Sequence, residues 1–216
     1  MTNLSLAADA LKDMAQVLGL TERSIASVAK RFQADMKSLA VIGMTGTSSI
    51  LADMRAIVKG AFGDAYVAGL KQGGVSFDEM GDDDATMIIE LSDAQLAFVT
   101  DFVKAIRESR TDKALQREIL DTRIPLWTAS VEAAGAYGLA SANGRMMGTW
   151  VLGKTEEHCE KTGDTMGCLQ LNGQRHSLKW FTSHGYIPRQ PGNNFITCGG
   201  WACDCSIVDD NGKKLM

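Results

Sequence analysis

The placement of the cysteines constrains this chain more than any other feature of its sequence. All five cysteines lie in the C-terminal part of a 216-residue chain, and the first 158 residues contain none. They are Cys159, Cys168, Cys198, Cys203 and Cys205. An odd number of thiols cannot all pair in intramolecular disulfides, and clustered thiols in a reducing compartment usually bind a metal ion. The candidate chemistry of the chain therefore lies beyond residue 158.

The cysteine spacing favours a structural zinc site. Such a site has four soft or borderline ligands, commonly supplied as two pairs from separate turns. Cys159 and Cys168 form one near pair, and the other three cysteines form a second cluster. Two glycines follow Cys198 and allow the backbone to turn tightly there. We expect one zinc ion held by Cys159, Cys168, Cys203 and Cys205, with Cys198 as the substitute ligand.

Other uses of these thiols remain open. A disulfide or mixed arrangement is one, and inert buried thiols are another. His158, His176 and His184 also compete for ligand positions. A zinc-dependent nuclease, or another enzyme with a Cys/His site, is a further alternative, but clustering favours ligation over nucleophilic attack. Residues 151–216 carry seven basic and seven acidic side chains, and this balance speaks against a nucleic-acid surface. We therefore predict no catalytic residues and no enzyme.

The composition changes near residue 150 and predicts two domains. Residues 1–150 are rich in Ala, Leu, Met and Asp, whereas Gly, Cys and aromatic residues dominate afterwards. We expect a mainly α protein, with a helical domain at 1–150 and a small Cys-rich, zinc-stapled α+β module at 151–216. The net charge of -4, the short apolar stretches and the absence of a signal-peptide pattern favour a chain that does not enter a membrane.

Apolar spacing and capping residues predict the helices of the first half. One helix is expected from Leu4 to Leu18, and a second after an N-cap at Thr21. Residues 41–47 are predicted to form a bend or loop. A third helix, capped by Thr47 or Ser48, is expected to end within residues 69–74. Its predicted buried face consists of Leu51, Met54, Val58, Ala61 and Ala65.

Further along the chain, four signals suit helix starts. Residues 82–84 are three aspartates that suit either a solvated loop or a helix N-terminus. Residues 92–95 have the pattern of a capping box. Asp112 begins another predicted helix, and Pro125 suits the first turn of the segment that follows. That segment, which extends to about Gly148, is rich in Gly and Ala and needs close packing to be stable.

The segment 174–189 mixes aromatic and basic residues. Exposed aromatic rings beside cations would suit base stacking in a nucleic-acid-binding protein. A module of about 60 residues has little apolar material to spare, however, so we favour a role in its core. The predicted core residues are Leu178, Trp180, Phe181, Tyr186 and Ile187.

The order of these features resembles the minor head, or head morphogenesis, proteins of tailed bacteriophages. The likeness covers roughly residues 50–75 and 125–208. It is carried by the segment 65–74, the small-residue helix, residues 157–159, residues 168–173 and the closing Cys203-x-Cys205. The first Cys pair is wider here than in that family, and Cys198 stands near the place of a usual His ligand.

The resemblance implies a virion protein without established enzymatic activity. It implies several copies in or near the head and its vertex, and a place in the host cytoplasm during assembly. Its partners would be portal, capsid or connector proteins, and copies of itself. A DNA-packaging accessory protein is the remaining alternative, and DNA contact stays open.

Overall fold

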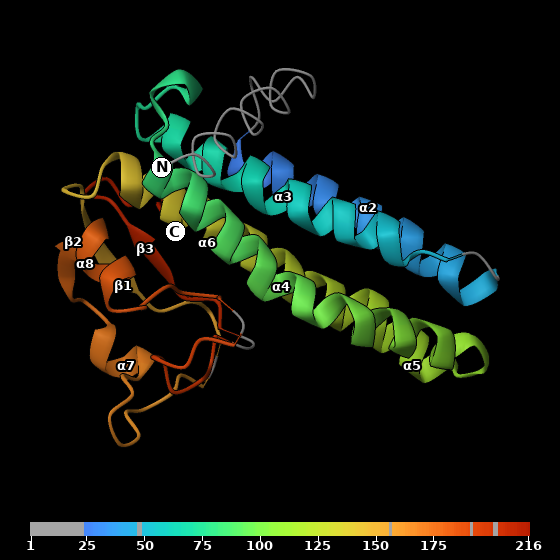
Figure 1. Ribbon diagram of the computed structural model, residues 1–216. Helices are drawn as coiled ribbons and strands as arrows, with labels where there is room; N and C mark the ends of the chain where they lie inside the picture. Colours follow the sequence, from blue (N-terminus) through green and yellow to red (C-terminus); the bar gives the residue numbers. More distant parts are fainter. Residues whose placement is uncertain (1–23, 47–48, 156, 191, 201–202) are drawn as a thin grey trace.

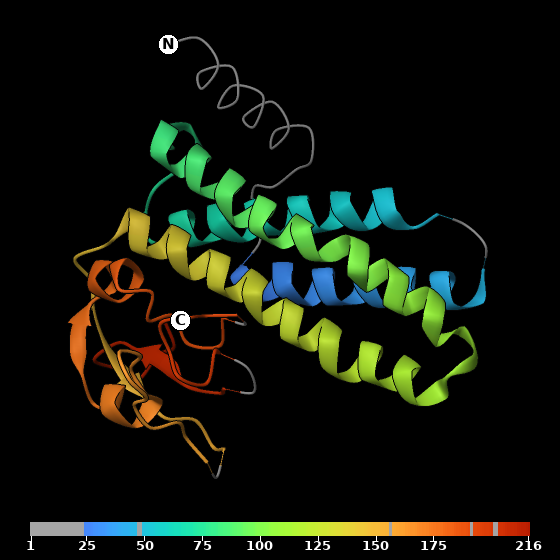
Figure 2. The ribbon, with the colours of Figure 1, turned by 60° about the horizontal axis from the view of Figure 1, so that its bottom comes forward.

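A computed structural model describes residues 24–46, 49–155, 157–190, 192–200 and 203–216. Its long helices lie alongside one another in an elongated bundle, and a small module lies against one end (Figures 1 and 2). The predicted mainly α fold with a small strand-containing module is thereby confirmed. The bundle comprises α2 (Ile25–Thr45), α3 (Leu51–Gln72), η2 (Phe77–Glu79), α4 (Asp82–Glu108), η3 (Ser109–Thr111), α5 (Lys113–Glu118), η4 (Ile119–Arg123) and α6 (Ile124–Ala142).

Helix α2 differs from the prediction at its C-terminal end. Its N-cap is Ser24, whose hydroxyl accepts a hydrogen bond from the Ser27 N–H at 3.2 Å. The helix continues through Thr45, so the bend predicted from residue 41 is wrong for residues 41–45. Gly43 is buried against Ile50 and Ile106, and this packing holds the last turns helical although glycine disfavours them. The predictions for Leu4–Leu18, Thr21, Thr47 and Ser48 lie outside the described residues.

The other helix predictions of the bundle have mixed outcomes. Helix α3 ends at Gln72 and buries Met54, Val58, Ala61 and Ala65, as predicted. The three aspartates begin α4, where their charges stabilise the helix N-terminus. The capping box predicted at 92–95 is wrong, because those residues lie within α4. Ser92 is only 1% exposed, so it lies packed inside the bundle and not at a helix start.

Helices α5, η4 and α6 form one continuous helical stretch. Asp112 caps it, since its Oδ1 atom accepts hydrogen bonds from the N–H groups of Ala114 and Leu115. The π-helical segment η4 ends at Arg123, two residues before Pro125. Proline has no N–H group and its ring clashes with the preceding turn, so a locally wider turn accommodates it.

Helices α3 and α6 approach each other at backbone distance. A Cβ atom on Gly69 would lie 1.9 Å from the Gly135 carbonyl oxygen. A Cβ atom on Gly138 would lie 2.0 Å from the Tyr66 carbonyl oxygen. Because neither position has room for a side chain, the small residues of α6 serve the packing of the bundle.

The C-terminal module is built on three short antiparallel strands. They are β1 (Met147–Val151), β2 (Arg175–Ser177) and β3 (Ser206–Val208), in the order β2-β1-β3. The module also contains α7 (Cys168–Leu171) and α8 (Leu178–Ser183), which confirms the predicted α+β character of the module. Ser177 caps α8 by accepting the Trp180 N–H at 3.1 Å, a local signal that the sequence analysis did not use.

Helix α6 belongs to both hydrophobic cores. Its first half packs in the bundle through Ile124, Trp127 and Val131. Its second half, with Leu139 and Ala140, packs against the module. Of the predicted module core, Leu178, Phe181 and Ile187 are fully buried, and Trp180 and Tyr186 are partly buried.

Charged side chains add a second link between α6 and the module. The Glu132 carboxylate lies 3.2 Å from an Arg189 guanidinium nitrogen and 3.9 Å from the Lys214 ammonium.

None of the helices among the described residues combines the length and apolar character needed to cross a membrane.

Candidate metal centre

All five cysteines meet on one side of the module, although they come from separate loops. Cys159 lies in the loop after β1, Cys168 is the first residue of α7, and Cys198 lies in a turn. Cys203 and Cys205 directly precede β3. Each of the five is a free thiol. The side chains of Cys168 and Cys205 are buried and the other three are partly buried.

The sulfur atoms form two groups that share Cys168. One group contains Cys159, Cys168 and Cys198, and the other contains Cys168, Cys203 and Cys205. Within each group all the sulfur atoms lie within 4.8 Å of one another. The Cys168 Sγ atom lies 3.8 Å from the Sγ atoms of both Cys198 and Cys203. The cysteines therefore lie close enough to bind a metal ion.

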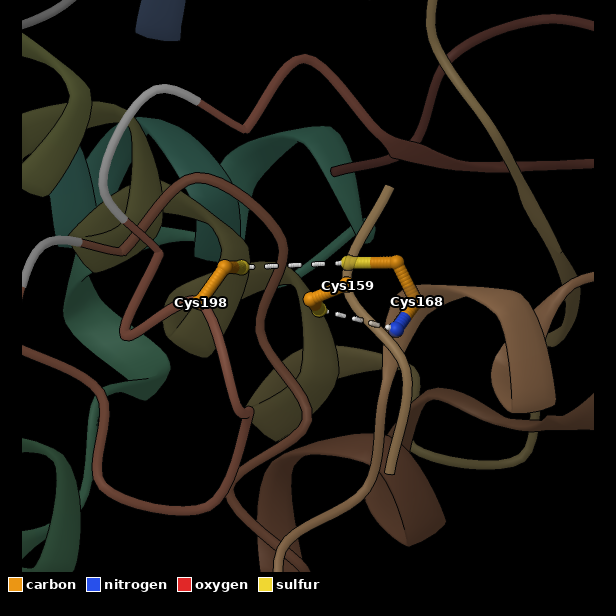
Figure 3. A group of neighbouring side chains, drawn as sticks. All are labelled: Cys159, Cys168 and Cys198. Carbon is orange, nitrogen blue, oxygen red and sulfur yellow. Dashed lines mark hydrogen bonds between the residues drawn. The ribbon is translucent and has the colours of Figure 1, made fainter. Parts of the chain in front are cut away.

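The loop between Cys159 and Cys168 closes on itself, so its length does not separate the two thiols. Thr162 and Thr165 form an antiparallel bridge around a turn, with Gly163 at a φ of +59°. The Cys168 N–H then donates to the Cys159 Sγ atom at 3.1 Å (Figure 3). A Cβ atom on Gly167 would lie 2.5 Å from the Cys159 carbonyl oxygen, so this approach requires glycine. The widened spacing thus still produces a paired turn.

A short parallel bridge brings Cys198 to Cys168. The Met166 N–H donates to the Phe195 carbonyl at 3.2 Å, and the Thr197 N–H donates to the Met166 carbonyl at 2.9 Å. Figure 3 shows the Cys198 and Cys168 sulfur atoms pointing toward each other from these two segments. The glycines at 199 and 200 have φ values of +61° and +70°, which confirms the predicted tight turn.

Asp204 holds the loop after β1 against the closing cysteines. Its carboxylate accepts hydrogen bonds from the N–H groups of Lys154 and Thr155 and from the Thr155 hydroxyl. The hydrogen bond from the Thr155 hydroxyl, together with those N–H groups, lowers the pKa of the Asp204 carboxyl. A side chain at Gly153 would collide with this carboxylate. The sequence analysis missed Asp204, although its place between two candidate ligands was a usable signal.

Hydrogen bonds among the thiols shift their pKa values in opposite directions. Hydrogen bonds with Cys198 and Cys203 raise the pKa of the buried Cys168 thiol. The same contact with Cys168 lowers the pKa of the Cys203 thiol. A divalent cation binds thiolates and displaces their protons, so metal binding would replace these hydrogen bonds by metal–sulfur bonds.

The three histidines have different positions. The His158 Nδ1 atom lies 3.7 Å from the Cys205 Sγ atom, which places it beside the cluster. His176 and His184 instead stack on Trp180, with ring centroids at 3.6 and 4.4 Å. These two rings belong to an aromatic stack in the module.

A separate cleft of about 1010 Å³ lies between the bundle and the module. Its polar lining includes Asp84, whose carboxylate accepts hydrogen bonds from the Tyr66 hydroxyl at 2.7 Å and the Ser141 hydroxyl at 2.6 Å. Burial raises the pKa of Tyr66 well above its usual range. These hydrogen bonds link α3, α4 and α6, so they stabilise the bundle.

Comparison with family models, curated proteins and solved structures finds no match for this chain.

Proposed function

We propose that this chain is a structural or assembly protein of a tailed-bacteriophage virion, and that zinc holds its C-terminal module together. One observation carries the zinc proposal. The other four cysteines gather around the buried sulfur atom of Cys168, although they lie far from it in the sequence or in other loops. The virion proposal rests on the resemblance of the cysteine pattern and the small-residue helix to minor head proteins. The proposed role is not enzymatic.

The donor set and its spacing suit zinc. Thiolates are soft ligands that select zinc over magnesium or calcium. A tetrahedral zinc ion with Zn–S bonds of about 2.3 Å holds its sulfur ligands about 3.8 Å apart. The Sγ atom of Cys168 lies 3.8 Å from those of Cys198 and Cys203. These pairs therefore already have the separation that zinc requires.

The architecture of the module explains why it needs a metal ion. Its three strands contain only five, three and three residues. Long loops connect them, and ordering each residue costs about 1–2 kcal/mol of backbone entropy. A structural zinc ion stabilises such small domains because the unfolded chain lacks the preformed site.

The zinc proposal is tested by metal analysis of protein purified without chelator. We expect zinc to co-purify with the full chain, and removal by a strong chelator to make residues 152–205 sensitive to protease. The bundle helices should remain folded by circular dichroism. Protein without zinc that stays equally resistant to protease would refute the role of zinc as a staple.

The virion proposal is tested on particles purified by density gradient from a lysate of the source host. We expect peptides of this chain to sediment with the capsid and portal proteins, at several copies per particle. The purified chain should also bind portal or capsid protein, or associate with itself, in sedimentation experiments. A chain that is absent from particles and remains a monomer without binding would contradict the proposal.

A further inference from the structure

We propose that the cysteine cluster binds two zinc ions that share the thiolate of Cys168. This inference rests on the zinc half of the proposed function and changes the expected number of ions from one to two. In this arrangement Cys168 is a bridging ligand, and the remaining donors divide between the two ions.

The grouping of the sulfur atoms is the first reason. A single ion with four cysteine ligands needs four sulfur atoms that all lie about 3.8 Å from one another. The described donors instead form two groups of three that overlap at one residue. Cys168 lies at the tetrahedral edge distance of 3.8 Å from one member of each group, Cys198 and Cys203. Each group supplies three sulfur atoms that lie close enough together to share one ion.

The burial of Cys168 is the second reason. Its side chain is only 1% exposed, and it lies between the two groups. A thiolate sulfur has more than one lone pair and can bind two cations at once. Two divalent ions would also offset most of the negative charge of five thiolates, and an uncompensated buried charge is costly.

His158 supplies a fourth ligand for the ion at Cys203 and Cys205. A tetrahedral zinc ion with one nitrogen ligand at about 2.0–2.1 Å and a sulfur at about 2.3 Å separates the two atoms by about 3.6 Å. The His158 Nδ1 atom lies 3.7 Å from the Cys205 Sγ atom. His158 is not among the donors that already lie within 4.8 Å of one another, so a movement of its side chain toward Cys168 and Cys203 would close this ion with four protein ligands.

The ion at Cys159 and Cys198 has a different environment. Its group contains three thiols among the described residues, so a water molecule would complete its tetrahedron. Cys159 and Cys198 are partly exposed, whereas Cys205 is buried. We expect this ion to exchange with solvent more readily than the other. Each binding step forms metal–sulfur bonds and releases the thiol protons to water.

The test uses the full chain loaded with zinc, and separately with ¹¹³Cd, followed by removal of the metal that remains free in solution. Native mass spectrometry should show two zinc ions per chain. The ¹¹³Cd spectrum should show two resonances of equal intensity that are coupled to each other through the shared sulfur. Stepwise titration with a chelator should remove one ion before the other.

Matched variants separate the two positions. Cys198→Ser should reduce the metal content from two ions to one while the module stays folded. His158→Ala should weaken binding of the more tightly held ion by tenfold or more. His184→Ala, which alters a histidine outside the cluster, should keep two ions.

One ion per chain with a single ¹¹³Cd resonance would overturn the two-ion proposal and leave the zinc staple intact. Two resonances without coupling would overturn the bridging role of Cys168. A chain that binds neither metal would overturn this inference and the zinc half of the proposed function together.

Discussion

The contact between helices α3 and α6 offers a sharp test of the fold. Gly138 lies on α6 where a Cβ atom would be 2.0 Å from the Tyr66 carbonyl oxygen and 3.1 Å from the Leu70 nitrogen. Ordinary contacts begin at 3.4 Å, so Gly138→Ala would force the two backbones apart by roughly 1.4 Å. Overpacking of this kind costs about 1–3 kcal/mol, and more where backbone rather than a flexible side chain must move.

The helix propensity of alanine acts in the opposite direction. Replacing glycine by alanine inside a helix stabilises it by about 1 kcal/mol. Because the collision is with backbone atoms, the upper part of the overpacking range applies. We therefore expect Gly138→Ala to lower the free energy of unfolding by about 2 kcal/mol, which corresponds to a fall in Tm of about 4–8 °C for a chain of this size.

Gly60 on α3 provides a matched control. It is exposed, and no atom lies within 4 Å of the position of a Cβ atom there. Gly60→Ala should raise the free energy of unfolding by about 0.5–1 kcal/mol. Both variants are measured by urea denaturation followed by circular dichroism at 222 nm. A Gly138→Ala protein as stable as the wild type, beside a stabilised Gly60→Ala protein, would refute the close approach of α3 and α6.

Three further predictions concern the module and the bundle. Cys205→Ser should make the module sensitive to protease and leave the bundle resistant; a cleavage pattern that spares the module would count against this. Asp204→Ala should weaken zinc binding by about tenfold in a competition assay with a chromophoric chelator, as loss of outer-shell support does, whereas Asp164→Ala should not; equal affinities would show that Asp204 does not position the site. Burial raises the pKa of Tyr66 above its usual value of about 10, so the folded state holds this proton more tightly. The stabilisation of the folded state that comes from this raised pKa is complete below about pH 10 and is lost as the pH rises further. Tyr66→Phe should therefore lose less stability above about pH 10 than the wild type in denaturation experiments. Parallel curves of stability against pH for the two proteins would contradict this.

The sequence predicted the elements whose signals are local. The buried face of α3 and the cap at Asp112 follow from spacing and side-chain chemistry within one turn or a few turns. The failures at residues 41–45 and at Ser92 have a shared cause. In both places a local breaker or capping signal lies inside a long helix that tertiary packing stabilises. Propensities of less than 1 kcal/mol do not prevail against the burial of a helix face.

The candidate metal centre was only partly predictable. The five cysteines were identified from the sequence, but their grouping depends on contacts between distant segments. The pairing of Met166 with residues 195–197 and the hydrogen bonds of Asp204 decide which thiols meet. Such long-range contacts leave no periodic signal in the sequence. The importance of Cys168 as the shared member of both groups therefore emerged only from the structure.

Helix α6 contributes to the core of the bundle and to the core of the module, and this bears on how the module would respond to loss of the proposed zinc ion. The first half of α6 folds with the bundle, so its second half already presents Leu139 and Ala140 to the module. The strands and the buried thiols of Cys168 and Cys205 pack in one core with this preformed face, whereas most of the residues in the connecting loops lie outside that core. Exposed hydrogen bonds such as those of Asp204 contribute about 1 kcal/mol each, which is less than the entropy lost by the residues they order. Loss of the proposed zinc ion should consequently release the cysteine loops first, while the bundle stays folded.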